Sequence, residues 1–235
     1  MSNGQFYSQA PAKTEVLNAF MRGVYQWMAI GLGLTGIVAF YTASSPKLLQ
    51  LIFGNPMLMW GLLIGEILLV IGISAGISKM SAQMATGLFL LYSGLNGLTL
   101  SAIFLVYTMS SIASTFLICA GMFGAMSVYG LITKKDLTSW GSFLFMGLIG
   151  LIIASIVNIF LKSSGLSFVI SGIGVLVFVG LTAYDTQKLK EMGLSAPYED
   201  SLAIRRGTIL GALTLYLDFI NLFLMLLRFF GQTRE

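Results

Sequence analysis

The sequence predicts an all-α fold: a polytopic membrane protein built as a bundle of seven transmembrane helices. Of its 235 residues, 57% are hydrophobic and only 9% are charged, whereas a soluble domain carries roughly 25% charged residues. The apolar residues also gather in seven runs. Each run is close to the roughly 20 residues that a helix needs to cross a bilayer.

Polar and turn-forming residues separate the seven runs and divide the chain into a tail, a transmembrane domain and a short end. Residues 1–22 are expected to form a soluble cytoplasmic tail, in which a helix could start at Thr14, and they lack the features of a signal peptide. The longest predicted loop runs from 186 to about 203, and residues 231–235 form a short C-terminal tail. The predicted spans within the transmembrane domain, 23–230, are 23–42, 57–77, 84–107, 112–132, 139–161, 167–184 and 204–230.

Composition excludes several classes of site. The chain has no histidine and one cysteine, Cys119, so a histidine pH switch, most zinc or haem sites and an internal disulfide are excluded. The formal charge of +4 reflects loops that face the cytoplasm and indicates no nucleic-acid partner. Gly31, Gly33 and Gly36 match a dinucleotide-binding pattern, but without a preceding strand they indicate a small-residue surface for helix contact.

Lysine and arginine are unevenly divided between the two sides of the predicted bundle. Nine fall on the side of the N-terminus, and four fall on the other side. Since cytoplasmic loops are enriched in these residues, the N-terminus is predicted to be cytoplasmic and the C-terminus to lie outside if all seven spans cross. The four on the other side are Lys47, Lys162, Arg228 and Arg234.

Four ionisable residues lie within or at the edges of the spans: Glu66, Asp185, Asp218 and Arg228. Charge is costly in hydrocarbon, so each is a functional candidate. Each also has a simpler explanation: Asp185 could end a helix at the interface, Glu66 could serve packing alone, and Arg228 could extend to the interface. Asp218 is hardest to explain in this way, because it lies mid-helix among apolar residues.

Two arrangements would make these charges tolerable. The aspartates Asp185 and Asp218 could share a proton or a cation, and Glu66 and Arg228 could pair at similar depth. On straight helices Asp185 lies well inward of Asp218. A meeting of the two therefore requires tilted helices or a loop that folds into the bundle.

Nearly the whole chain resembles the transmembrane Bax inhibitor motif family. The resemblance rests on three segments: GLTAYDTQ at 180–187, LYLDFINLF at 215–223 and LLRFFG at 226–231. Because the chain lacks the lysine-rich C-terminus of animal members, it resembles a bacterial one, and this implies the inner membrane. The resemblance also implies a pH-sensitive calcium leak, with calcium as the transported ion and no cofactor.

The resemblance assigns roles to particular residues. It implies that Asp185 and Asp218 form a hydrogen-bonded pH sensor and cation site, and that Glu66 and Arg228 form a supporting ion pair. It also implies a basic residue near the inner end of the second span, for which Lys79 is the nearest candidate here.

Other functions compete with the calcium leak. An intramembrane aspartyl protease needs Gly-x-Gly-Asp, but Tyr216 and Leu217 precede Asp218, so no enzyme is predicted. A retinal protein needs a lysine in the last span, which has none. The main alternative is a non-transporting regulator that binds another membrane protein, such as a membrane protease.

Overall fold

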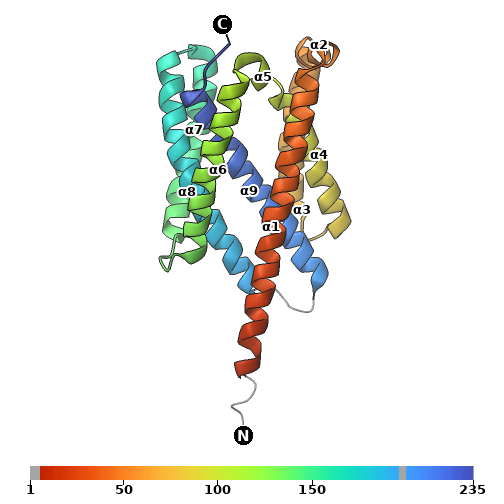
Figure 1. Ribbon diagram of the computed structural model, residues 1–235, viewed down its shortest axis with the longest axis vertical. Helices are drawn as coiled ribbons and strands as arrows, with labels where there is room; N and C mark the ends of the chain where they lie inside the picture. Colours follow the sequence, from red (N-terminus) through yellow and green to blue (C-terminus); the bar gives the residue numbers. More distant parts are fainter. Residues whose placement is uncertain (1–5, 196–199, 235) are drawn as a thin grey trace. The chain divides into compact units, whose positions relative to one another are not determined.

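The chain folds into helices joined by short connections (Figure 1). The computed structural model describes residues 6–195 and 200–234, with side chains from residue 14 onward. The helices are α1 (Phe6–Ala43), α2 (Pro46–Phe53), α3 (Pro56–Gly76), α4 (Ala82–Leu100), α5 (Ile103–Val106), α6 (Met109–Ile132), α7 (Thr138–Leu161), α8 (Ser164–Ser195) and α9 (Ser201–Phe230).

The predicted seven-helix membrane fold is confirmed. In the described part of the chain, seven helical segments are long and apolar enough to cross a bilayer, with α4 and α5 together forming the third. The last segment, α9, has 30 residues, about 45 Å at the rise of an α-helix, which exceeds the roughly 30 Å of a hydrocarbon core.

Several predicted boundaries were wrong. Helix α1 begins at Phe6, before Thr14, where a helix was expected to be able to start, and α8 continues to Ser195, beyond the predicted span that ended at Tyr184. Most of the predicted loop 186–203 is therefore helix, and its residues 196–199 lie outside the described part, as do 1–5 and 235 of the tails. Hydropathy ends a span where charges begin, but lysine and glutamate are good helix formers and the helix continues through them.

Side chains at the turns fix where several helices start. Pro46 and Pro56 occupy the first helical position of α2 and α3, where a missing N–H costs nothing. Asn55 accepts hydrogen bonds from the first amides of α3, at 3.1 and 3.3 Å. Ser81 and Thr108 cap α4 and α6 in the same way. The region predicted as the first loop therefore contains a short helix, α2.

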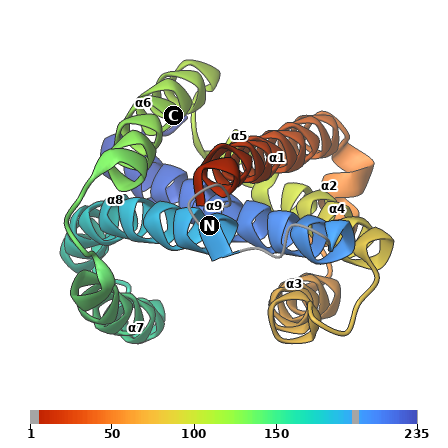
Figure 2. The same cartoon turned by 90° about the horizontal axis from the view of Figure 1, so that it is seen from below.

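By its internal contacts the chain divides into two compact units, and the dividing points fall near α5 and within α8 and α9. The first unit comprises Met1–Leu105 and Leu189–Tyr216. In it, α4 contacts both α1 and α3 (Figure 2). The backbones of α1 and α4 approach closely at Gly97, where a Cβ would lie 2.7 Å from the carbonyl oxygen of Thr35.

The predicted small-residue surface at 31–36 is only partly correct. Gly31 packs tightly, since a Cβ there would lie 2.6 Å from the ring of Phe89. A Cβ at Gly33 or Gly36 would meet no described atom within 4 Å. Only one of the three glycines thus serves a close helix contact in the described structure.

The second unit comprises Val106–Lys188 and Leu217–Glu235. Close contacts hold α7 against α8: a Cβ at Gly180 would lie 2.7 Å from Leu144. The residues after α9 return along the segment before α6, where Tyr107 and Thr233 form an isolated antiparallel bridge. The described part of the C-terminal tail is thus anchored.

Candidate functional site

The carboxyl groups of Asp185 on α8 and Asp218 on α9 are hydrogen bonded to each other within the second unit. Asp218 is 5% exposed and Asp185 is half-buried. Two ionised carboxylates can only accept hydrogen bonds, so this contact requires a proton on one of them. The Oδ2 atom of Asp218 is buried and has no hydrogen-bond partner among the described residues.

Both aspartates lie inside helices. Asp185 is ten residues before the end of α8 at Ser195, so it does not mark the end of a helix, as one explanation had it. The two side chains therefore meet from positions within α8 and α9.

The residues after Asp185 tie α8 to its neighbours with directional hydrogen bonds. The hydroxyl of Thr186 lies 2.9 Å from that of Ser127 on α6. Gln187 accepts from the Leu137 N–H and donates to the Lys135 carbonyl, both at 2.8 Å. These bonds fix the α8 side of the pair against α6 and the turn that follows it.

Contacts around Asp218 are mainly apolar. The ring of the next residue, Phe219, makes edge contacts with those of Phe116 and Phe123, each with centroids 5.4 Å apart. The thiol of Cys119 lies 3.6 Å from the Phe219 carbonyl oxygen. The α9 side is therefore held by aromatic edge contacts and one weak thiol hydrogen bond.

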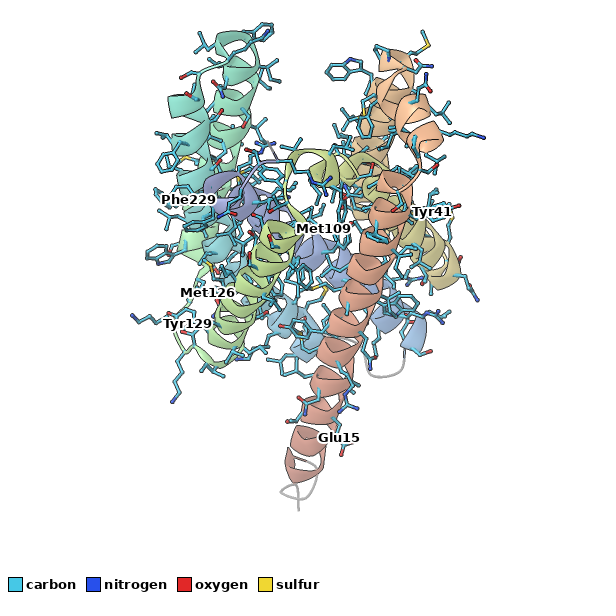
Figure 3. The ribbon with its side chains drawn as sticks, turned by 45° about the horizontal axis from the view of Figure 1, so that its top comes forward. Glu15, Tyr41, Met109, Met126, Tyr129 and Phe229 are labelled. Atoms are coloured by element: carbon cyan, nitrogen blue, oxygen red, sulfur yellow. The ribbon has the colours of Figure 1, made fainter. Side chains whose placement is uncertain are left out.

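A pocket of about 270 Å³ borders α8, and its lining includes Tyr184, the residue before Asp185. Met126 and Tyr129, both on α6, also line it (Figure 3). The ring of Tyr184 packs directly on Gly141 of α7, where even a Cβ would clash. The α8 turn that carries Asp185 thus has open space on one side.

The basic residue that acts electrostatically on Asp185 is Lys188, one turn further along α8. It is exposed, and its Nζ lies 6.0 Å from the centre of the Tyr184 ring. Lys79, the predicted basic partner, lies in the first unit, exposed in the turn after α3. Its role stays a prediction.

Glu66 belongs to a separate polar network in the first unit. It is 7% exposed in the middle of α3. One carboxyl oxygen accepts from the hydroxyl of Thr99 at 3.0 Å, and the other accepts from the amide of Asn96 at 3.3 Å. Both oxygens of this buried carboxyl are therefore satisfied by neutral donors on α4.

The network continues to α9 and α1. The hydroxyl of Tyr216 lies 3.1 Å from Oδ1 of Asn96 and 2.6 Å from the hydroxyl of Thr35. Thr35 in turn donates to the carbonyl of Ser93 at 2.8 Å. We call Thr35, Glu66, Asn96, Thr99 and Tyr216 the Glu66 network.

Arg228 lies in the second unit, exposed near the end of α9. It lines a pocket of about 450 Å³ between the ends of α7, α8 and α9. Glu66 belongs to the first unit, so the predicted ion pair between these two residues stays a prediction.

The aspartate pair has the donor chemistry of a calcium site but too few ligands to complete one. Calcium takes six to eight oxygen ligands, and two carboxyl groups supply at most four. In the described residues, no cluster of three or more His, Cys, Asp or Glu side chains accompanies them. A calcium ion bound here would therefore need water for its remaining ligands.

The comparison with known families agrees with these motifs. A family model described as "Inhibitor of apoptosis-promoting Bax1" matches residues 17–235. The chain belongs to this family. The resemblance predicted from the three motif segments is thereby confirmed, and the chain is an integral membrane protein of the Bax inhibitor family.

Similar family members occur in distant bacteria. The chain is 58% identical to Inner membrane protein YbhL of Escherichia coli strain K12 over 218 residues, 93% of each chain. It is 48% identical to an uncharacterized protein of Borreliella burgdorferi over 225 residues, 95% of this chain and 97% of the relative. An uncharacterized membrane protein of Streptococcus pyogenes serotype M6 is 38% identical over 221 residues, 92% of this chain and 93% of the relative.

Sequence reasoning missed most of the Glu66 network. An asparagine inside an apolar span is costly without a partner, so Asn96 carried a usable signal. Thr35 and Thr99 carried none, because hydroxyl residues are common in membrane helices and can bond to their own backbone. Thr186 and Gln187 belong to the motif at 180–187, but the motif does not show that they fasten α8 to α6 and its turn.

Proposed function

We propose that this Bax inhibitor family member conducts a pH-sensitive calcium leak across the bacterial inner membrane, with Asp185 and Asp218 as proton sensor and cation site. One observation supports it above the others. Two hydrogen-bonded carboxyl groups lie on membrane-spanning helices, and one of their oxygens, Oδ2 of Asp218, is buried without a partner. Such an arrangement is costly in hydrocarbon and typical of ion or proton pathways.

While the two carboxyl groups share one proton, the ion path stays closed. With one proton the two carboxyl groups carry a single negative charge and bridge α8 to α9. When that proton leaves, two like charges face each other at low dielectric and repel. The proton belongs to the pair as a whole, so neither aspartate alone defines the titration.

Repulsion then moves the α9 side more easily than the α8 side. Next to Asp185, hydrogen bonds of Thr186 and Gln187 tie α8 to α6 and its turn. Next to Asp218, the contacts of Phe219 are two aromatic edge contacts and a hydrogen bond from a thiol, which is a weak donor. A divalent cation neutralises the two ionised carboxylates, and Oδ2 of Asp218, which has no hydrogen-bond partner among the described residues, can bind it.

The distribution of basic residues and the relatives support the location. The E. coli relative is named an inner membrane protein. Lys134 and Lys135, in the turn between α6 and α7, belong to the lysine-rich side predicted to be cytoplasmic. Gln187, two residues after Asp185, is bonded to the carbonyl of Lys135, and this contact supports a position of the aspartate pair near the side predicted to be cytoplasmic.

Calcium flux into proteoliposomes tests the proposal at a series of pH values on both sides of neutrality. Asp218→Asn and Asp185→Asn replace a carboxyl that can lose a proton with an amide that cannot, so each should make flux independent of pH. The matched control is Asp136→Asn, an exposed aspartate of the same unit that accepts from the Thr138 N–H at 2.8 Å. Asparagine can keep that bond, and pH dependence should survive.

Two outcomes would contradict the proposal. A wild-type pH profile in Asp218→Asn would remove the sensor role from the pair. An absence of flux in the wild-type protein at every pH would favour the alternative function, a non-transporting regulator of another membrane protein.

A further inference from the structure

The pocket that Arg228 lines, about 450 Å³ in volume, has the chemistry of an anion site. Two of its side chains, Lys162 and Arg228, are cationic, and four more are neutral and polar: Ser155, Asn158, Ser164 and Ser167. No carboxylate is among the described residues that line it. Two cations facing one cavity without a counter-charge favour binding of an anion.

Lys162 occupies an unexpected backbone position. It ends α7 in the left-handed conformation, with φ 51° and ψ 33°, and is the only non-glycine residue with positive φ in the part of the chain that the structure describes. Glycine adopts this conformation without strain, and most helices that end this way use it. A lysine in this strained backbone conformation points to a use for its charge.

The polar side chains are prepared to donate hydrogen bonds. Asn158 donates to the hydroxyl of Ser167 at 2.6 Å, which leaves the Ser167 proton without an acceptor among the described residues. The pocket also lies at the first residues of α8, a helix of 32 residues. The partial positive charge of a helix N-terminus adds to that of the two cations.

The surroundings of the pocket are lipid-facing. Ile159, Phe160 and Leu161, at the end of α7, are 66%, 81% and 63% exposed. On the other side, Phe229 (Figure 3) stacks on Phe168 of α8 with ring centroids 4.5 Å apart. The pocket therefore opens where apolar surface gives way to a polar turn, the level of phospholipid headgroups.

We propose that this pocket binds the phosphate group of an anionic phospholipid headgroup. Arg228 supplies paired N–H donors that match phosphate oxygens, and Lys162 supplies a second charge. The site is separate from the aspartate pair and does not depend on the proposed calcium leak. Inorganic phosphate has the same chemistry, so the test separates the two sources.

Binding is measured on the full-length protein in detergent, by native mass spectrometry and by thermal unfolding. The probes are phosphatidylglycerol, zwitterionic phosphatidylcholine and inorganic phosphate.

Removal of either cation should lower the affinity for phosphatidylglycerol about fivefold, which is the contribution of one basic residue near an anionic membrane surface. The variants are Lys162→Gly, which suits the left-handed backbone, and Arg228→Gln. Lys162→Arg keeps the charge and should keep the affinity.

The control is Lys47→Gln, an exposed lysine at the start of α2 that is predicted to lie on the same side of the membrane. It should bind like the wild type. The buried thiol of Cys119, 0% exposed, reports folding of the second unit in each variant, because it reacts with maleimide only after opening.

Three results are decisive. Selective binding of phosphatidylglycerol that Lys162→Gly and Arg228→Gln both weaken supports the site and identifies a lipid. If the two variants lose affinity for inorganic phosphate as much as for phosphatidylglycerol, and the wild type does not prefer the lipid, the site is supported and its ligand is a soluble anion. Affinities that are the same in the folded variants, the control and the wild type overturn the proposal.

Discussion

Tyr216 is the central member of the Glu66 network, and Tyr216→Phe removes its hydroxyl while keeping its ring. The ring makes edge contacts with Phe89 and Tyr92, with centroids 5.9 and 5.7 Å away. Because phenylalanine preserves these contacts, the substitution isolates the hydrogen bonds. Tyr216 is also two residues before Asp218 on α9.

The expected loss follows from the partners of that hydroxyl. Thr35 keeps its bond to the Ser93 carbonyl at 2.8 Å. Oδ1 of Asn96 accepts a hydrogen bond from the Tyr216 hydroxyl at 3.1 Å. In Tyr216→Phe this acceptor loses that donor. A buried acceptor left without a donor costs about 1–3 kcal/mol, while hydrogen bonds between membrane helices average about 0.6 and reach about 1.7 kcal/mol. We expect a loss of about 1–2 kcal/mol in the free energy of unfolding.

Reversible unfolding in mixed micelles of SDS and a mild detergent measures this loss. Tyr92→Phe is the matched control, because Tyr92 is buried in the same aromatic cluster and its hydroxyl makes no hydrogen bond within the described residues. A double-mutant cycle with Thr35→Val should give a coupling energy near the upper part of the membrane range, given the 2.6 Å contact.

Equal unfolding free energies for Tyr216→Phe and Tyr92→Phe would refute this reasoning. So would a coupling energy near zero between Thr35 and Tyr216. Either result would mean that the Glu66 network contributes little to holding α1, α4 and α9 together.

Two further predictions concern the surroundings of the aspartate pair. Gly130→Ala should destabilise the protein by about 1–3 kcal/mol, because its Cβ would meet the backbone carbonyl of Ala183. Gly121→Ala, with no described atom within 4 Å of its Cβ, should instead stabilise the protein by up to about 1 kcal/mol, because alanine favours a helix more than glycine does. Equal free energies of unfolding for the two variants would contradict this. Hydrogen bonds from the hydroxyl and N–H of Thr138 lower the pKa of Asp136. The carboxylate therefore stabilises the first turn of α7 fully at a pH above the pKa that Asp136 has in the unfolded chain. This stabilisation is lost as the pH falls through the lower pKa that Asp136 has in the folded protein. Hydrogen exchange in that turn should therefore be faster in Asp136→Ala at neutral pH and unchanged below the folded pKa, whereas a pH-independent difference would contradict the assignment.

The number and approximate place of the spans could be predicted from the sequence because they depend on local composition. A run of about 20 apolar residues is stable in hydrocarbon whatever its neighbours are. The same reasoning failed at the end of α8, where charges begin but the helix continues to Ser195. It also failed to foresee α2, which is only eight residues long.

The ionisable residues could be picked out for the same local reason, since charge inside an apolar run is rare. Their partners could not. Glu66 is bonded to Asn96 and Thr99, 30 and 33 positions away in the sequence, and neither partner is charged. Lys188, on the same helix as Asp185, acts electrostatically on it and was not singled out from the sequence.

The sequence by itself determined that this chain crosses a membrane as a helical bundle and that it carries three acids and an arginine at costly positions. Only the tertiary structure decided that Asp185 meets Asp218, that Glu66 joins a network of neutral donors, and that Lys162 and Arg228 line one pocket. The physical reason is that insertion depends on how apolar each segment is. The choice of partner depends on how each helix is rotated and packed, and small differences in side-chain shape along the whole interface set that rotation.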